Sequence, residues 1–185
     1  MFRPRLFLVA PEAPAERLIA CLAAACAAGD VASLLVPSHC ARELIELAQA
    51  KGVAVIANGE EIAGADGIQV DAGEVAETRR KLGTGAIVGA LTGASRHLAL
   101  EAAEAGADYV ALSRTGPALG GESIIGWWSA LVEIPCVAFE PASPADLDIL
   151  LPQNPDFIRP PDAMWDSAEA SKLVVTAMME RISRP

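Results

Sequence analysis

The chain has 185 residues, of which 52% are hydrophobic and only 4% aromatic, and its formal net charge is −10. This length predicts one domain, spanning residues 1–185, with a substantial aliphatic core. The acidic balance excludes the basic footprint of a nucleic-acid-binding protein and argues against an anionic membrane surface. No uncharged apolar run is long enough to span a membrane, and the run before Pro11 is too short for a signal peptide. We therefore expect a cytoplasmic protein.

Short apolar runs alternate with amphipathic segments along the whole chain. Apolar strands without polar alternation are typical of a parallel sheet covered by helices. Strands are predicted at residues 5–9, 31–36, 53–57, 67–70, 86–91, 109–112, 136–139 and 157–159. Helices are predicted at 13–28, 39–51, 74–82, between Ser95 and Gly106, and at 123–132, 145–151 and 167–181, with one helical turn at 59–63.

A recurring aspartate supports a closed arrangement of these units. Asp30, Asp66, Asp108 and Asp156 each stand just before an even-numbered strand. A repeat on alternate strands is what a barrel built from quarter units shows. The fold class predicted is therefore α/β, a compact (βα)8 TIM barrel, with an open doubly wound sheet as the alternative. The four aspartates would lie at the amino ends of the strands, opposite an active site, and read as turn residues.

In such a barrel, catalytic groups lie after the carboxyl ends of the strands. Asp71 is a candidate Mg²⁺ ligand because hard cations prefer carboxylate oxygens, although a solvated loop acid is equally consistent. Ser143 opens a Ser-Pro-Ala-Asp capping box whose N–H groups could bind phosphate or simply cap a helix. The candidates in chain order are Ser38, His39, Asn58, Glu60, Asp71, Thr92, Ser95, Arg96, His97, Ser113, Arg114, Thr115, Glu140, Ser143, Arg159 and Asp162.

Two classes of chemistry are disfavoured by what these positions lack. The lysines are Lys51, Lys81 and Lys172, all predicted in or beside helices, so no amine is available for a Schiff base. The four cysteines show no metal-binding spacing, and neither histidine forms a recognisable catalytic pattern with a cysteine nucleophile. A disulfide framework is not expected in a chain of this size.

Several segments resemble, in their order and spacing, the thiamine-phosphate synthase/TenI family, and most closely its divergent alphaproteobacterial branch. They are Gly29–Leu35, Gly64–Val70, Ser95–His97, Glu104–Val110, Trp127-Trp128 and Ile134–Ala138. The resemblance implies a (βα)8 barrel and phosphorylated pyrimidine or thiazole ligands. Synthases of the family join hydroxymethylpyrimidine pyrophosphate to thiazole phosphate with Mg²⁺, releasing pyrophosphate, whereas TenI relatives isomerise a thiazole carboxylate phosphate.

The chain departs from the family pattern at its anion-binding positions. The basic Gln-x-Arg-x-Lys after strand two is replaced by Leu34–Ser38, and the Asn-Asp after strand three by Asn58-Gly59. The glycine-bearing phosphate loops after strands seven and eight are replaced by Phe139–Ser143 and Arg159–Asp162. We therefore predict weak or lost synthase activity in a protein of thiamine biosynthesis. A TenI-like isomerase and a non-catalytic barrel that binds a metabolite or partner are the alternatives.

We expect a homodimer because of the Trp127-Trp128 pair on one predicted helix, where one indole packs on the barrel and the other faces an interface or solvent. We also assign roles to the candidate site residues from the family resemblance. The catalytic candidates are Arg114 and His97. The substrate- or phosphate-binding candidates are Asn58, Ser95, Arg96, Ser113, Ser143 and Arg159, and the metal candidate is Asp71.

Overall fold

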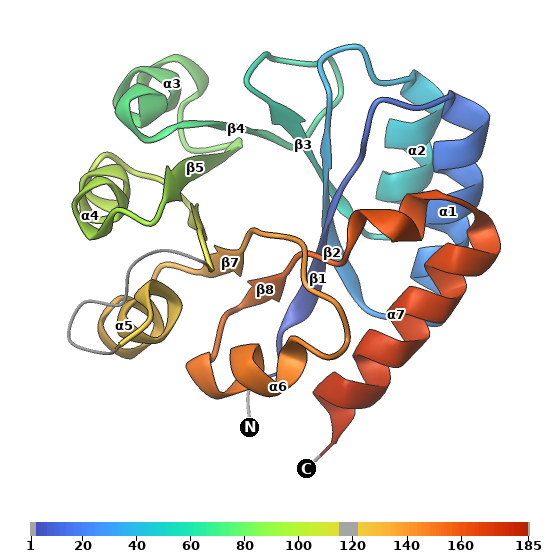
Figure 1. Cartoon of the computed structure of the whole chain (residues 1–185). Helices are drawn as coiled ribbons and strands as arrows, with labels where there is room; N and C mark the ends of the chain where they lie inside the picture. The colour runs from blue at the N-terminus through green and yellow to red at the C-terminus, as the bar shows by residue number, and fades with distance from the viewer. Residues whose placement is uncertain (1–2, 115–121, 185) are drawn as a thin grey trace.

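Eight parallel strands close into a barrel in the order of the chain (Figure 1). The computed structural model describes residues 3–114 and 122–184, so the candidate Thr115 lies outside the described residues. Pairing of Arg5 with Phe157 and of Leu6 with Ile158 joins the first strand to the last. The predicted closed barrel is confirmed, and the open sheet is wrong. The strands are β1 (Arg5–Val9), β2 (Val31–Val36), β3 (Ala54–Asn58), β4 (Gly67–Asp71), β5 (Ile87–Gly93), β6 (Tyr109–Leu112), β7 (Cys136–Ala138) and β8 (Phe157–Ile158).

Helices surround the barrel, and α1 and α7 pack against each other on its outside (Figure 1). None of those within the described residues is both long enough and apolar enough to cross a membrane. The α-helices are α1 (Ala15–Ala28), α2 (Arg42–Ala50), α3 (Val75–Leu82), α4 (Arg96–Glu104), α5 (Ile124–Leu131), α6 (Leu147–Leu150) and α7 (Ala168–Ser183). Three 3₁₀ turns are η1 (Ala72–Glu74), η2 (Leu151–Gln153) and η3 (Asp162–Trp165).

The helical turn predicted at residues 59–63 is wrong, because β3 and β4 are joined by turns and bends alone. Gly59 and Gly64 have φ angles of 78° and 90°. These left-handed conformations are open to glycine and cannot continue a right-handed helix. The other predicted elements are present, and their ends differ by a few residues.

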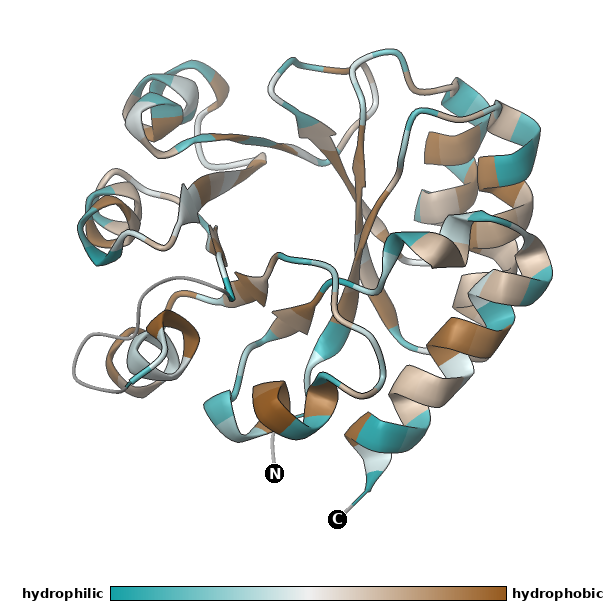
Figure 2. Cartoon of the chain, in the orientation of Figure 1, coloured by the Kyte–Doolittle hydropathy of each residue, from teal (hydrophilic) through white to brown (hydrophobic). Residues whose placement is uncertain are grey.

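Apolar side chains fill both the space inside the barrel and the layer between strands and helices. The interior holds Phe7, Leu35, Ile56, Tyr109, Ala111 and Val137. Figure 2 shows apolar residues along β1 and β2, and both polar and apolar residues on the surrounding helices. The barrel interior is therefore largely a packed core, and in such barrels the active site lies at the carboxyl-end mouth.

Tyr109 is the largest polar side chain inside the barrel. Its hydroxyl donates to Gln69 Oε1 at 3.0 Å, and burial raises the pKa of the phenol far above its ordinary value. The ring lies over Gly89, where a Cβ atom would come within 2.0 Å of it. Glycine at position 89 is therefore what admits the tyrosine.

The repeated aspartates join neighbouring strands at the amino ends of the barrel. Asp66, Asp108 and Asp156 each accept a hydrogen bond through Oδ2 from a backbone N–H of the preceding strand, at 2.7, 2.7 and 2.8 Å. The donors are Val55, Val88 and Cys136 respectively. Asp30 instead pairs with the Arg5 side chain of β1 at 2.8 Å. These contacts explain the repeat as a structural device on the face opposite the mouth.

Candidate active site

The mouth is built chiefly by polar residues that follow β6, β7 and β8. Ser113 and Arg114 come directly after β6, and the Ser113 hydroxyl donates to Glu140 Oε1, which lies after β7. Arg114 Nη2 donates to the Pro141 carbonyl at 3.3 Å. Because the carboxyl ends of parallel strands meet at one edge, residues far apart in sequence converge here.

Arg114 is held by a carboxylate from the segment before α6. Its Nη1 lies 3.1 Å from Asp146 Oδ1. The other oxygen of Asp146 accepts hydrogen bonds from the Ser143 backbone N–H at 2.8 Å and from the Ser143 hydroxyl at 2.6 Å. These bonds from Ser143, helped by the Arg114 charge, lower the pKa of Asp146 below its ordinary value of 3.8. Of the capping box predicted at Ser143, the bond from its N–H to the Asp146 side chain is present, but the Ser143 hydroxyl donates to the same carboxylate and does not accept from the Asp146 N–H.

Arg159, after β8, is fixed in a similar way. Its Nη2 lies 2.7 Å from Asp162 Oδ1, Nη1 donates to the Phe139 carbonyl at 3.4 Å, and the guanidinium lies 5.4 Å from the centre of the Phe139 ring. The Nε atoms of Arg114 and Arg159 are buried, with no hydrogen-bond partner among the described residues. Such an unmade bond costs about 1–3 kcal/mol, so each Nε–H is a ready donor for a ligand oxygen.

A second, smaller group lies where β3 and β4 end. Asn58 and Asp71 line a hollow of about 110 Å³ together with Glu74 and Leu91. Within residues 3–114 and 122–184, no cluster of three or more His, Cys, Asp or Glu side chains could hold a metal. The donor set nevertheless suits Mg²⁺, which keeps several waters and takes one or two carboxylates together with substrate phosphates.

The residues after β5 do not converge with the groups after β6 to β8. The Ser95 hydroxyl caps α4 by accepting from the Leu98 N–H at 3.2 Å. Arg96 lies 4.6 Å above the Trp127 ring and 3.8 Å from Glu122. His97 has a side chain 80% exposed and pairs with Glu101 one turn along the same helix.

Of the paired tryptophans, Trp128 packs on the barrel, as predicted for one of the two indoles. Trp128 is fully buried and donates from Nε1 to the Ile134 carbonyl at 2.7 Å. Trp127 stays partly exposed under Arg96.

The cysteines take no part in this site. All four are free thiols in the structure. Burial raises the pKa of Cys136 to about 11, and it also raises the pKa values of Cys26 and Cys40. A thiol with a raised pKa carries little thiolate at neutral pH and is a poor nucleophile.

Asp146 and the Phe139 ring are the members of the mouth to which sequence reasoning gave no role. Asp146 was visible as the last residue of the capping box. Its pairing with Arg114 joins residues 32 positions apart and depends on the closed barrel. The only available signal was the acid at the fourth position of Ser-Pro-Ala-Asp, which identifies the local turn and leaves the second partner open.

Comparison with known proteins agrees with this architecture. Residues 6–151 match the family model described as thiamine monophosphate synthase. A thiamine-phosphate synthase of Erythrobacter litoralis is 36% identical over 91% of this chain and 75% of its own length, and one of Rhodospirillum centenum is 34% identical over 97% and 98%. A thiamine phosphate pyrophosphorylase structure from Pyrococcus furiosus superposes with a TM-score of 0.76 at 19% identity, covering 96% of this chain and 95% of that one. The chain therefore belongs to the thiamine monophosphate synthase family, a family of thiamine biosynthesis.

Proposed function

We propose that the protein couples a pyrimidine pyrophosphate to a thiazole phosphate in thiamine biosynthesis, and that it does so slowly. The reaction class is supported by relatives named thiamine-phosphate synthase that match nearly the whole chain. The low rate is supported by one observation above all: Arg114 and Arg159 at the mouth are each paired with an aspartate of the same chain.

Departure of pyrophosphate builds negative charge on the leaving oxygens. A synthase must meet that charge with preplaced cations and N–H donors, and removing one such donor typically costs about 10²–10³ in rate. Here the end of β2 carries Val36, Pro37 and Ser38, so it offers no cation. Lys51, Lys81 and Lys172 lie at the end of α2, in α3 and in α7.

The anion site in this proposal is formed by the groups after β6, β7 and β8. Arg114 and Arg159 would donate from their buried Nε–H groups, and the Ser113 and Ser143 hydroxyls would orient the phosphate. Ser95 and Arg96 stay candidates for phosphate binding, which requires Arg96 to leave its place above Trp127. A catalytic role for His97 also remains a prediction.

Mg²⁺ fits the hollow at the ends of β3 and β4. Asp71 would hold it directly, and Asn58 would orient the pyrophosphate or a bound water beside it. When bound, the cation neutralises part of the pyrophosphate charge.

Free thiols and a biosynthetic family also support the cytoplasmic location expected from the sequence.

Steady-state synthesis from the two phosphorylated substrates with Mg²⁺ tests the proposal. We expect turnover far below the enzyme median of about 10 s⁻¹, and a further loss of about 10²-fold in Arg114→Ala or Arg159→Ala. Arg42→Ala, which removes an exposed arginine paired with Glu46 on α2, is the control and should leave the rate unchanged. Turnover near the median would contradict the slow rate. Ligand binding without product would instead favour the non-catalytic alternative.

A further inference from the structure

A second hollow lies at the end of the barrel opposite the mouth. It has a volume of about 540 Å³ and is bordered by the residues that precede β1, by α6 and η2, and by the carboxyl end of α7. Ligand pockets in proteins commonly measure about 300–1,000 Å³. None of the residues given a role in synthesis lines it.

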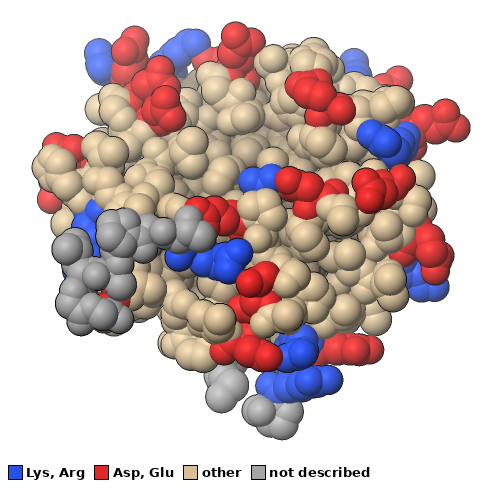
Figure 3. Space-filling view, in the orientation of Figure 1, with Lys and Arg blue, Asp and Glu red and all other residues tan. Residues whose placement is uncertain are grey.

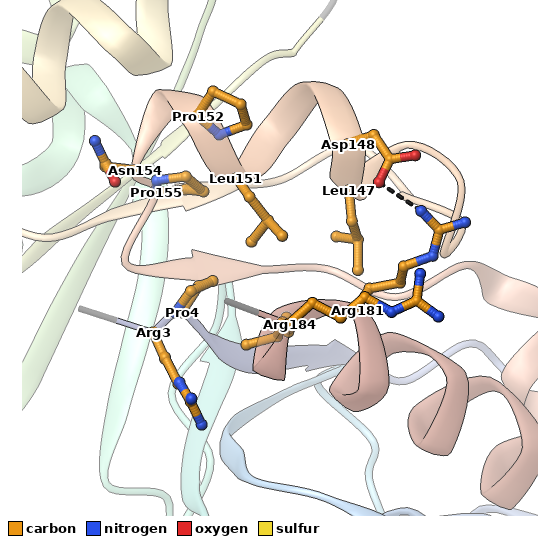
Figure 4. A pocket seen from close by; sticks show the side chains of 11 residues that line it. Arg3, Pro4, Leu147, Asp148, Leu151, Pro152, Asn154, Pro155, Arg181 and Arg184 are labelled. Carbon is orange, nitrogen blue, oxygen red and sulfur yellow. Dashed lines mark hydrogen bonds and ion pairs between the residues drawn. The ribbon is translucent and has the colours of Figure 1, made fainter. Parts of the chain in front are cut away.

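The floor of this hollow is apolar. Leu147 and Leu151 point from α6 and η2 toward the end of α7 (Figure 4), and Ile182 of α7 also lines the hollow. Leu147 is fully buried and Ile182 is 5% exposed. Three prolines complete the walls and keep them stiff: Pro4, Pro152 and Pro155.

The rim is cationic, although the chain as a whole carries a net charge of −10. Among the described residues that line the hollow, Arg3, Arg181 and Arg184 stand against one acid, Asp148, so three positive charges and one negative leave a formal charge of +2. Asp148 pairs with Arg181. Arg3 has a long hydrogen bond of 3.5 Å to the Ser183 carbonyl, and within residues 3–114 and 122–184 no hydrogen bond or ion pair engages the Arg184 side chain. Figure 3 shows basic side chains gathered at the lower edge of this view, close to where α7 ends in Figure 1.

We propose that this hollow is a second ligand site, which takes a small phosphate monoester whose organic part is apolar and flat. The Arg184 guanidinium, which points to the same side of the hollow as that of Arg181 (Figure 4), would bind the phosphate, since arginine matches the geometry of such anions, and Arg3 would add positive charge from the other side of the rim. The apolar part would lie on Leu151, Leu147 and Ile182 and displace water from them. The site is independent of the proposed function, because it lies on the opposite end of the barrel.

Calorimetry of the full chain with 1-naphthyl phosphate, inorganic phosphate and 1-naphthol tests both halves of this recognition. We expect 1-naphthyl phosphate to bind more tightly than either fragment. Binding should weaken about tenfold in Arg3→Glu/Arg184→Glu, because two attractive charges become repulsive. The matched control is Arg17→Glu/Arg42→Glu, which makes the same charge change on the exposed arginines of α1 and α2 and should bind normally.

Asp148→Asn should raise the affinity for 1-naphthyl phosphate, a result that a misfolded variant could not give. It removes the one acid of the rim and frees Arg181, so binding should tighten severalfold. Amide shifts on titration should appear at Leu151 and Ile182 and be absent at Ser113, which separates this site from the mouth. Equal affinity in the two double variants, or inorganic phosphate binding as tightly as the aryl ester, would overturn the proposal. So would amide shifts confined to the mouth.

Discussion

Arg114 and Asp146 lie 3.1 Å apart at the mouth of the barrel, and Ser143 holds the same carboxylate with two further hydrogen bonds. The carboxylate therefore occupies donors that an incoming phosphate would need. An internal anion of this kind competes with the ligand, because the cation must give up one partner before it gains the other.

Removing the charge of Asp146 should strengthen anion binding. In Asp146→Asn the amide oxygen can still accept from Ser143, while the charge that holds Arg114 is lost. We expect the affinity for inorganic pyrophosphate, measured by calorimetry, to rise about tenfold. Glu46→Gln, which removes the acid of the exposed Arg42 pair, is the control. Unchanged affinity in Asp146→Asn would show that Asp146 does not limit access to Arg114.

Asp146 should also make the protein sensitive to acid. Its pKa is lowered in the folded state, so its contribution to stability is full above the unfolded value near 3.8 and is lost as the pH falls through the folded value. Urea unfolding between pH 6 and 3 should show wild-type stability falling toward that of Asp146→Asn. A difference between the two proteins that stayed constant over this range would contradict the assignment.

Filling the space under Tyr109 should destabilise the barrel. A Cβ atom at position 89 would lie 2.0 Å from the Tyr109 ring, so Gly89→Ala requires the interior to shift. We expect a loss of about 1–3 kcal/mol in the free energy of unfolding. Gly73→Ala is the matched control, because nothing lies within 4 Å of its new methyl group. Equal stability of the two variants would mean that the interior yields easily.

Loss of a repeated aspartate should weaken the barrel at its amino ends. Asp66→Ala removes the acceptor of the Val55 N–H, and a partly buried backbone donor left unpaired costs about 1–3 kcal/mol. Thermal unfolding should show the lower stability. Glu77→Ala, an exposed acid in the first turn of α3, controls for loss of charge and should change the stability by no more than about 0.5 kcal/mol.

Association into a homodimer remains a prediction, with α4 and α5 as the candidate surface. Leu98, Leu100 and Leu131 are 39%, 40% and 68% exposed, and Trp127 lies partly exposed beside Arg96. Light scattering at micromolar concentration should give twice the monomer mass of 19.1 kDa. Leu131→Glu should then shift the mass toward the monomer, whereas a wild-type monomer would exclude the dimer.

The barrel was predictable from the sequence because its signals are local. Apolar runs and capping residues such as Ser95 act within a few residues, and the aspartate repeat reaches only the preceding strand, 11 to 20 residues away. Together these signals set the order of strands and helices. The region after β3 was misassigned because Gly59 and Gly64 adopt left-handed conformations that a helical pattern conceals. For the mouth, the sequence predicted which residues follow the strands, but it did not predict which of their side chains contact one another. Whether Arg96 turns toward the mouth or lies on Trp127 depends on packing between α4 and α5, and no local pattern records that.

Asp66, Asp108 and Asp156 each bond to the preceding strand, and we call these contacts aspartate bridges. They divide the barrel into units, and we expect a break in the chain between two units to be tolerated better than a break within one. Each bridge lies in a turn that enters an even-numbered strand, while the turn from α3 to β5 carries none. Arg3 already reaches the Ser183 carbonyl, so the described ends of the chain lie side by side. A circular permutant opened near Gly83 keeps the three aspartate-to-backbone bonds within continuous segments, although it separates Arg79 from Asp108, whereas one opened at Gly64 separates Val55 of β3 from Asp66. The barrel is thus modular, and its seams lie before odd-numbered strands.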